Sequence, residues 1–526
     1  MNRKEWRWVA LVTLALVAAS SLPYLVAWAA TPEGARFTGL LVNPLDGHSY
    51  IAKMRQGLDG SWRFRLAFTP ESQDGKPVYL FFLLLGHVAR WIDLPLILVY
   101  HAARTLGGVA MLLALYALIS QLGKDVGERR TMFLLTALGS GVGWLAGSLG
   151  VMTADLWVIE AFPVYALLAN AHFPLAMGLM MGIAACGLQI AACRARMTEC
   201  RWQMMGGTAG AVTLGVIQPF GLVAVLGGLG VMLVARMVRK RAILWRAWAW
   251  AIGTGALALF YPGYMQWAMR SDPVLAAWNA QNVTFSPPLW DWALSYGLVL
   301  VLAVLGSVVA ARRRLDGDWL LLGWVAVTLV GVYLPLSLQR RLSLGLGAPM
   351  GLLAGMGWWR IVRPRVRVGG RWRMQVLVTA FCTLTTVFLI SMMLLAALAG
   401  EPRFYLSEGE WQALAWLREE ASHDQVVLCA PQTGMFVPAW AGQRVVYGHP
   451  FETVDAERRE AQVEAYWAGE MDTAEQEPFL RDNGVGYVLV GPREHALCGG
   501  AEAQECKGAG KLVFEADDVK VYEVTW

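Results

Sequence analysis

The stretch that decides the fold is the apolar run from Trp8 to Ala30, WVALVTLALVAASSLPYLVAWAA, with the polar segment after it, TPEGARFTGLLVNPLDGHSY (31–50). A helix needs about 20 apolar residues to cross a bilayer, and the run from Trp8 to Ala30 has that length without a charged residue. We therefore expect a first transmembrane helix and then a loop in water. The alternative is a cleaved signal peptide ending near Ala30, for which the run is long.

The composition extends this pattern to most of the chain. Of 526 residues, 56% are hydrophobic and 16% are charged, against about 25% charged in soluble domains. The mean hydropathy is +0.45, which excludes a soluble enzyme and a disordered chain. Residues 401–526 hold 23 acidic and 10 basic residues, whereas residues 1–400 carry a net charge of +18. We predict a polytopic α-helical membrane domain (1–400) and a C-terminal soluble α/β domain (401–526).

Further apolar segments complete the membrane domain. Those long enough for a crossing, or nearly so, are 95–120, 131–150, 173–192, 204–235, 247–269, 292–311, 319–338, 342–359 and 376–399. The segment 204–235 is too long for one crossing, and Pro219 interrupts it because proline lacks a backbone N–H. We read it as two antiparallel helices, which gives about eleven crossings in total.

Lysine and arginine in the short loops predict the orientation. Every second loop is basic, and the stretch 360–373 alone holds six arginines, whereas 151–171 has no lysine or arginine and 269–291 has only Arg270. Basic loops stay in the cytoplasm. We therefore expect a multi-pass protein of the plasma (inner) membrane, with a cytoplasmic N-terminus and an extracytoplasmic C-terminal domain.

The acidic tail shows alternating helix and strand patterns. Residues 408–421 have helical spacing, and β-rich runs occupy 425–429, 444–447, 486–490, 511–515 and 519–524. This alternation favours a small sheet covered by helices. Cys498 and Cys506 could form a disulfide if the tail faces an oxidising compartment. Cys186, Cys193 and Cys200 recur every seven residues, which we interpret as small apolar positions along a helix and not as a ligand set.

The first loop holds the most informative acidic residue. Asp46 is placed to act as a general base for an acceptor hydroxyl or as a metal ligand. The alternatives are a solvated side chain or the N-cap of a helix over 47–57. Further along the loop, Trp62, Phe64, Leu66 and Phe68 alternate with arginines at positions 63 and 65, and we expect this strip to lie on the lipid headgroups.

The second predicted external loop adds Asp155 and Glu160 to an otherwise apolar segment. Ionisable groups in such surroundings are costly and often functional, although both residues could instead cap short interfacial helices. His172 closes this loop, where a packed, hydrogen-bonded histidine is the alternative to a substrate-binding one.

Three arginines require anionic partners. Arg104 lies inside an apolar segment, and Arg340 and Arg341 lie at the predicted external end of another. Paired guanidinium groups suit a phosphate, while a lipid headgroup or a carboxylate such as Asp46 or Glu160 would also satisfy them. The sequence has no Walker A, HExxH or GxSxG motif, and its basic residues follow the loops, so nucleic acid is not an expected partner.

The order of these parts resembles the GT-C class of bacterial membrane glycosyltransferases of the cell envelope. The resemblance rests on one span, a long loop with an early Asp46, KPVY (76–79) before an amphipathic stretch, and a second span with Arg104. It is supported by AHFP (171–174), QPF (218–220), and the tail segments GQRVVYGHPFET (442–453) and YVLVGP (487–492).

The resemblance implies transfer of a sugar from a polyprenyl-phosphate donor in the membrane to a glycan, lipid or protein acceptor. Asp46 would activate the acceptor or hold a divalent metal such as Mg or Mn, and Asp155 or Glu160 would complete the catalytic site. Substrate binding would fall to five further residues: Tyr50, Arg104, His172, Arg340 and Arg341. Many members carry a second acid next to the first, whereas Asp46 is followed by Gly47 and His48. A non-catalytic membrane scaffold or assembly subunit with this fold, and a lipid or glycan transporter, are the alternative functions.

Overall fold

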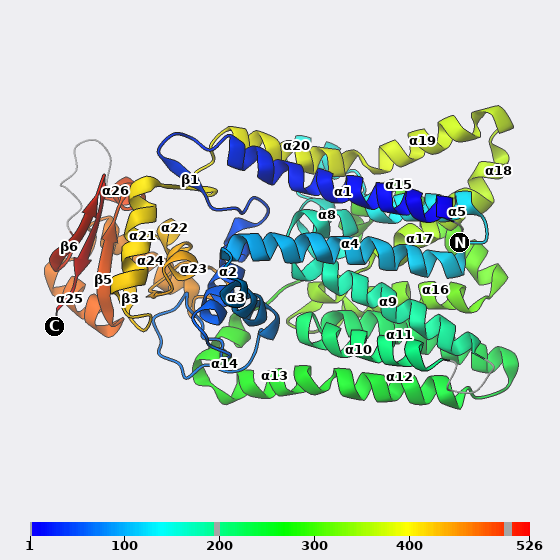
Figure 1. Cartoon of the computed structure of the whole chain (residues 1–526), viewed down its shortest axis with the longest axis horizontal. Coiled ribbons are helices and arrows are strands. Elements are labelled where there is room, and N and C mark those ends of the chain that lie inside the picture. Colours follow the sequence, from blue (N-terminus) through cyan, green and yellow to red (C-terminus); the bar gives the residue numbers. More distant parts are fainter. Residues whose placement is uncertain (1–2, 194–199, 499–507, 526) are drawn as a thin grey trace. The chain divides into compact units, whose positions relative to one another are not determined.

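The computed structural model in Figure 1 describes residues 3–193, 200–498 and 508–525. The chain divides into two compact units. The first, which we call the helical unit, comprises residues 1–23, 101–264 and 283–393. The second, which we call the mixed unit, comprises residues 24–100, 265–282 and 394–526, so it combines the first loop with the tail. The boundary that we predict at residue 400 lies between a membrane domain and a soluble domain. The two compact units are a different division of the chain and do not test it, so this boundary stays a prediction.

The helical unit is built from helices of very different length. They are α1 (Arg3–Ala29), α4 (Leu96–Leu122), α5 (Val126–Leu138), α6 (Gly143–Ser148), α7 (Ala154–Trp157), η1 (Ile159–Ala161), α8 (Pro163–Leu168), α9 (His172–Ala192), α10 (Arg201–Ile217), α11 (Phe220–Lys240), α12 (Trp245–Ala258), α13 (Phe260–Ser271), α15 (Leu289–Arg313), α16 (Asp316–Gly331), η3 (Gln339–Ser343), α17 (Gly347–Gly357), η4 (Trp358–Val362), α18 (Arg363–Arg365), η5 (Val368–Gly370), α19 (Arg371–Cys382) and α20 (Leu384–Leu398). Four of these, α1, α4, α13 and α20, continue into the mixed unit.

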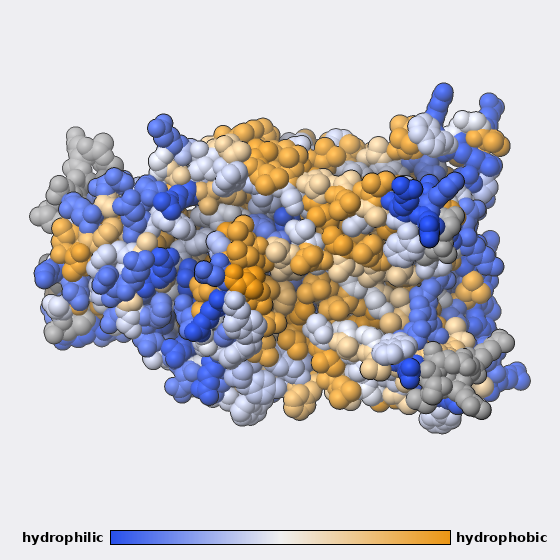
Figure 2. Space-filling model, viewed as in Figure 1, coloured by the Kyte–Doolittle hydropathy of each residue, from blue (hydrophilic) through white to orange (hydrophobic). Residues whose placement is uncertain are grey.

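Within the described residues, six helical segments are long and apolar enough to cross a membrane: α1, α4, Val126–Ser148, α9, α11 and α15. The pair Val368–Cys382 and Leu384–Leu398, bent by 46°, would be a seventh. The remaining apolar runs form shorter helices, α10, α12, α16 and α17, so the count of eleven crossings stays a prediction. Hydrophobic residues gather on the surface of these helices in Figure 2. The chain is a multi-pass membrane protein by the length and composition of its helices.

Two glycines allow the helices α15 and α17 to approach each other closely. A Cβ atom built on Gly306 in α15 would lie 1.9 Å from the carbonyl oxygen of Leu353 in α17, and one on Gly357 would lie 2.0 Å from that of Leu302. Small residues permit such close backbone contact between membrane helices.

The predicted break at Gln218-Pro219 is confirmed, because α10 ends at Ile217 and α11 begins at Phe220.

The tail forms the α/β domain that its sequence pattern predicts. A five-stranded sheet has the order β4-β3-β5-β7-β6, in which β3 is parallel to β4 and β5 while β7 is antiparallel to β5 and β6. The strands are β3 (Val426–Leu428), β4 (Arg444–Val445), β5 (Val485–Val490), β6 (Lys511–Ala516) and β7 (Val519–Glu523). The helices of the mixed unit are α2 (Pro44–Leu58), α3 (Leu80–Ile92), α14 (Pro273–Gln281), α21 (Glu408–Glu420), α22 (Pro431–Gly434), α23 (Val437–Trp440), α24 (Ala456–Trp467), α25 (Thr473–Asp482) and α26 (Pro492–Leu497).

A small second sheet joins the first loop to the tail, and the sequence did not suggest it. Strand β1 (Ala35–Phe37) pairs antiparallel with β2 (Tyr405–Ser407). The guanidinium of Arg36 donates two hydrogen bonds to the carboxylate of Glu408, at 2.7 and 2.8 Å. The first loop is therefore part of the same compact unit as the α/β domain.

The expectation that the aromatic strip lies on lipid headgroups is wrong for three of its four members. Phe64, Leu66 and Phe68 are buried, with at most 1% of each side chain exposed, and only Trp62 is exposed, at 47%. The segment runs against the tail, since the backbone N–H of Val445 donates to the carbonyl of Ala67. Phe68 lies against His449 of the tail, with ring centres 5.5 Å apart, whereas Phe64 lies against Tyr79 of the first loop, with ring centres 4.9 Å apart.

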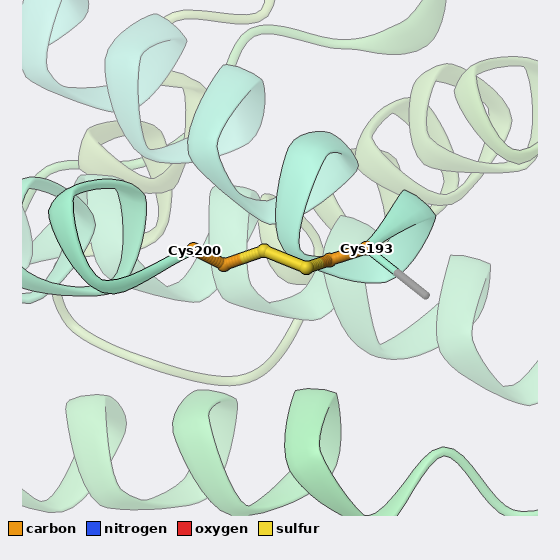
Figure 3. Close-up of a disulfide and its surroundings, with 2 residues drawn as sticks. All are labelled: Cys193 and Cys200. Carbon is orange, nitrogen blue, oxygen red and sulfur yellow. A yellow bond between two sulfur atoms is a disulfide. The ribbon is translucent and has the colours of Figure 1, made fainter. Parts of the chain in front are cut away.

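The cysteines at positions 193 and 200 form a disulfide between the end of α9 and the start of α10 (Figure 3). This corrects their interpretation as merely small apolar positions, while Cys186 is a free thiol. The expected pair of Cys498 and Cys506 includes a residue outside the described ranges.

Candidate functional site

Asp46 stands in the first turn of α2 in the mixed unit. The N-cap position is Asn43, in a left-handed conformation with φ of 47°, and Pro44 follows it. Proline is favoured at the first position of a helix, and a carboxylate is stabilised there by the helix dipole. Asp46 is thus not the N-cap itself. Its side chain is 38% exposed, and the side-chain amide of Asn43 donates to its Oδ2 atom.

The tail brings a histidine to the other oxygen of this carboxylate. His449, from the segment between β4 and α24, places Nε2 3.3 Å from Oδ1 of Asp46. Its side chain is 1% exposed. The backbone N–H of Phe451 donates to Nδ1 of His449 at 3.1 Å. In the sequence, the segment that holds His449 is marked only by its resemblance to the C-terminal domains of GT-C proteins.

A buried ion pair lies further along the same helix. Nζ of Lys53 is 2.6 Å from Oε1 of Glu452, and the hydroxyl of Ser49 donates to the same oxygen at 2.6 Å. The exposed fractions of the Lys53 and Glu452 side chains are 1% and 12%. Burial by itself would raise the pKa of the Glu452 carboxyl, but the charge of Lys53 and the hydrogen bonds from Lys53 and Ser49 outweigh it and hold that pKa below its usual value. Glu452 is therefore a carboxylate in the folded protein.

Aromatic rings enclose the lysine. The ammonium of Lys53 lies 5.6 Å from the ring centre of Tyr50, 5.2 Å from that of Phe64 and 5.1 Å from that of Tyr79. Tyr50, a predicted substrate-binding residue, stacks on Phe82 with ring centres 4.4 Å apart. These contacts place Tyr50 beside the ion pair on α2.

His48 follows Asp46 by two positions and is a packing residue in this structure. Its Nδ1 atom donates to the carbonyl of Pro44 at 2.7 Å, and its ring lies 4.8 Å from that of Phe436. Burial lowers the pKa of His48 to about 3. The imidazole is therefore neutral and adds no charge next to Asp46.

Asp155 in the helical unit is buried, with 1% of its side chain exposed. Its carboxylate accepts hydrogen bonds from the backbone N–H groups of Gly141 (3.2 Å) and Gly143 (3.0 Å) and from the hydroxyl of Thr153 (2.7 Å). Burial raises the pKa of this carboxyl. These contacts join two loops of the unit, and a catalytic role for Asp155 stays a prediction.

Two predicted site residues meet in the helical unit. Glu160 in η1 accepts a hydrogen bond from Nε of Arg340 in η3 at 3.1 Å, and the exposed fractions of their side chains are 9% and 26%. The guanidinium of Arg340 lies over the ring of Trp157, and that of Arg341 lies over the ring of Phe220. The carboxylate partner considered as an alternative to phosphate is thus present for Arg340.

Arg104 and His172 are both buried in the helical unit. Arg104 in α4 donates to the carbonyls of Leu167 (2.6 Å) and Ser20 (3.3 Å) and to the hydroxyl of Ser21 (3.2 Å). His172 begins α9, and its ring centre lies 4.0 Å from that of Phe173. The arginine thus ties α4 to two other segments, and a substrate contact of either residue stays a prediction.

The expected divalent metal would need several ligating side chains close together. Among residues 3–193, 200–498 and 508–525, no group of three or more His, Cys, Asp and Glu residues is arranged to hold a metal ion. Asp46 and His449 supply two donors, but Glu452 is engaged by Lys53. The described residues do not fit a metal, and we derive no step through one.

The similarity to known proteins is structural. No protein-family model matches the sequence, and no curated protein sequence does. ArnT from Cupriavidus metallidurans bound to undecaprenyl phosphate aligns with a TM-score of 0.55 and 13% identity, over 98% of this chain and 97% of that one. The chain has the GT-C fold. ArnT in the apo state aligns with a TM-score of 0.54 and 12% identity, over 97% and 98%.

A third GT-C structure supports the same fold. The arabinofuranosyltransferase AftD from mycobacteria aligns with a TM-score of 0.56 and 17% identity over 99% of this chain, which spans 42% of that protein. The predicted GT-C-like fold is therefore confirmed, including a tail domain with strands. At such identities the similarity extends to the fold and not to individual residues.

Proposed function

We propose that the protein is a membrane glycosyltransferase that transfers a sugar from a polyprenyl-phosphate donor to an extracytoplasmic acceptor. The observation that carries the proposal is Asp46, a partly exposed carboxylate with a donor at one oxygen and a histidine at the other, in a chain with the GT-C fold. His449 and the neighbouring pair of Lys53 and Glu452 are 1%, 1% and 12% exposed, whereas Asp46 is 38% exposed, so Asp46 is the group of this cluster that a solvent-side hydroxyl can reach.

In the proposed reaction, Asp46 acts as the general base. The acceptor oxygen forms a bond to the anomeric carbon, and its proton passes to the Asp46 carboxylate. The bond between the anomeric carbon and the phosphate oxygen breaks, and its electron pair leaves with the polyprenyl phosphate. A positioned general base contributes about 10²–10⁴ in rate.

Arg340 and Arg341 are proposed to bind the donor phosphate. A guanidinium has five N–H donors, and the contact of Arg340 with Glu160 uses Nε, so this pairing is compatible with a phosphate contact. The structure of ArnT with undecaprenyl phosphate supports a lipid phosphate as the class of donor. Arg104 and His172 are proposed to act on the same donor, and Asp155 and Glu160 to complete the site.

Replacing Asp46 tests the proposal. The assay measures release of undecaprenyl phosphate by the purified protein in lipid nanodiscs, from a panel of undecaprenyl-phosphate-linked pentoses and hexoses and in the presence of a panel of glycan, lipid and peptide acceptors with free hydroxyl groups. Asp46→Asn is expected to lower the rate by about 10²–10⁴ with an unchanged melting temperature. Asp74→Asn, an exposed acid of the same loop, is the matched control and is expected to keep the wild-type rate.

Two outcomes contradict the proposal. If the Asp46→Asn variant releases undecaprenyl phosphate at the wild-type rate, Asp46 is not the general base. A wild-type protein that binds undecaprenyl phosphate but releases none from any donor would favour the scaffold or the transporter.

A further inference from the structure

We propose that His449, contributed by the C-terminal domain, is a positioning residue for Asp46 and that this domain is a working part of the transferase. The inference rests on the proposed function, because it assigns Asp46 the role of base. It concerns the segment 448–453, whose role the resemblance and the fold leave unassigned.

The hydrogen bonds of His449 fix its tautomer. The backbone N–H of Phe451 donates to Nδ1 at 3.1 Å, so Nδ1 must carry a lone pair. A neutral imidazole has one N–H, which must then be on Nε2. Nε2 lies 3.3 Å from Oδ1 of Asp46 and is buried without an aligned hydrogen bond among the described residues, so its N–H is available for that oxygen. His449 is thus set to donate to Asp46 and not to take a proton from it.

The carboxylate is held at both oxygens. Asn43 donates to Oδ2, while His449 faces Oδ1. Donors directed at the charged form favour that form. The two side chains together orient the plane of the carboxylate.

The tail holds His449 in place through its neighbours in the segment. The hydroxyl of Thr453 accepts from the backbone N–H of His449 at 3.3 Å and donates to the carbonyl of Phe68 at 2.7 Å. Glu452 pairs with Lys53 seven residues along α2 from Asp46. These contacts connect the segment to both the first loop and the helix that bears the base, so a displacement of the tail would displace His449 from Asp46.

The kinetic test compares two replacements of His449 in the full-length protein. His449→Leu removes the donor and is expected to lower kcat by about 10–100-fold, the effect of losing one hydrogen bond to a charged group, with KM for the undecaprenyl-phosphate-linked sugar unchanged. His449→Gln presents an amide N–H near the position of Nε2 and is expected to restore most of kcat. His495→Gln, an exposed histidine of the same domain, is the control. Equal kcat in wild type and His449→Leu would overturn the inference.

A second variant covers the case in which His449→Leu does not fold. Asn43 is exposed and has a positive φ, so Asn43→Gly keeps the backbone conformation and removes the donor at Oδ2. A fall in kcat with KM unchanged supports the two-sided hold, and wild-type kcat contradicts it.

A measurement without substrate separates this inference from the proposed function. The protein has seven histidines, and the ¹⁵N resonances lost in His449→Gln identify His449. We expect an unprotonated Nδ1, a protonated Nε2, and a change of the Nε2 resonance in Asp46→Asn. A protonated Nδ1, or an Nε2 resonance indifferent to Asp46→Asn, would refute the pairing even if transfer is observed. The expected resonances in a protein that transfers no sugar would refute the proposed function alone.

Discussion

Replacing Lys53 with methionine should destabilise the mixed unit strongly. Lys53 and Glu452 are paired at 2.6 Å with 1% and 12% of their side chains exposed. Methionine keeps most of the volume but leaves Glu452 as a buried charge, with Ser49 as its remaining hydrogen-bond donor in the described contacts. Removal of one partner from a buried pair costs about 3–5 kcal/mol.

The expected size of the effect follows from the burial of the pair. For a unit of this length, 1 kcal/mol corresponds to about 2–4 °C in melting temperature, so Lys53→Met should lower it by about 6–20 °C. The exposed pair of Arg65 and Asp424 also joins the loop to the tail, at 2.8 Å, but its side chains are 48% and 76% exposed. Asp424→Asn is therefore the matched control, and we expect a change of at most about 0.5 kcal/mol.

The pH dependence gives the prediction a sign. The pKa of Glu452 is held below its usual value in the folded protein, so its contribution to stability is complete above the unfolded pKa, about 4.3, and is lost as the pH falls through the folded pKa. Without Lys53, burial is expected to raise the pKa of Glu452 above its unfolded value, so the folded protein takes up a proton that the unfolded chain does not, and the stability of Lys53→Met should rise as the pH falls from about 7 to about 5.

Thermal unfolding of the full-length protein in detergent, at these two pH values, measures both effects. The double variant Lys53→Met/Glu452→Leu removes both charges and should recover most of the stability. A melting temperature of Lys53→Met equal to that of Asp424→Asn would refute the reasoning.

Three other outcomes are expected. Arg341→Lys should raise the Michaelis constant for the lipid donor, because an ammonium does not reproduce a bidentate guanidinium contact; an unchanged constant with a lower melting temperature would mean a structural arginine. Arg104→Met leaves the carbonyl of Leu167 without its donor and should cost about 1–3 kcal/mol of stability; loss of undecaprenyl phosphate binding at unchanged stability would instead support a phosphate contact. Alkaline phosphatase fused after Trp526 should be active and a fluorescent protein dark, and the reverse would overturn the predicted orientation.

The parts of the fold that could be predicted are those with a local signal. An apolar run such as Trp8 to Ala30 needs no partner to reveal a span, and the β-rich runs of the tail alternate over a few residues each. Strand β1 has three residues and pairs with β2 far along the chain, so its sequence carries no comparable pattern. The alternation through Phe64, Leu66 and Phe68 predicted a strip on the lipid headgroups, and this was wrong because a local pattern does not reveal which part of the chain packs against it.

The candidate site shows the same division. Asp46 was recognisable because it is an acid just after a span, and the pairing of Glu160 with Arg340 had been foreseen as one alternative. His449 and Glu452 had no local mark of function, because their partners lie on α2; the separation between Ser49 and Glu452 is 403 positions. The segment that holds both was recognised by resemblance alone. Its role became visible only when the fold placed it beside Asp46.

The pairing of β1 with β2 also governs when the molecule can be completed during synthesis. Arg36 emerges from the ribosome 372 residues before its partner Glu408, an interval of roughly 20–70 s at about 5–20 residues per second. Throughout this time the first loop has no strand to pair with, and Phe68 lacks the His449 ring that it contacts in the folded protein. The nascent chain therefore carries an incomplete, partly apolar loop until translation has almost finished. A ribosome that stops before residue 405 releases a product that lacks both β2 and His449, so Asp46 has no histidine beside it.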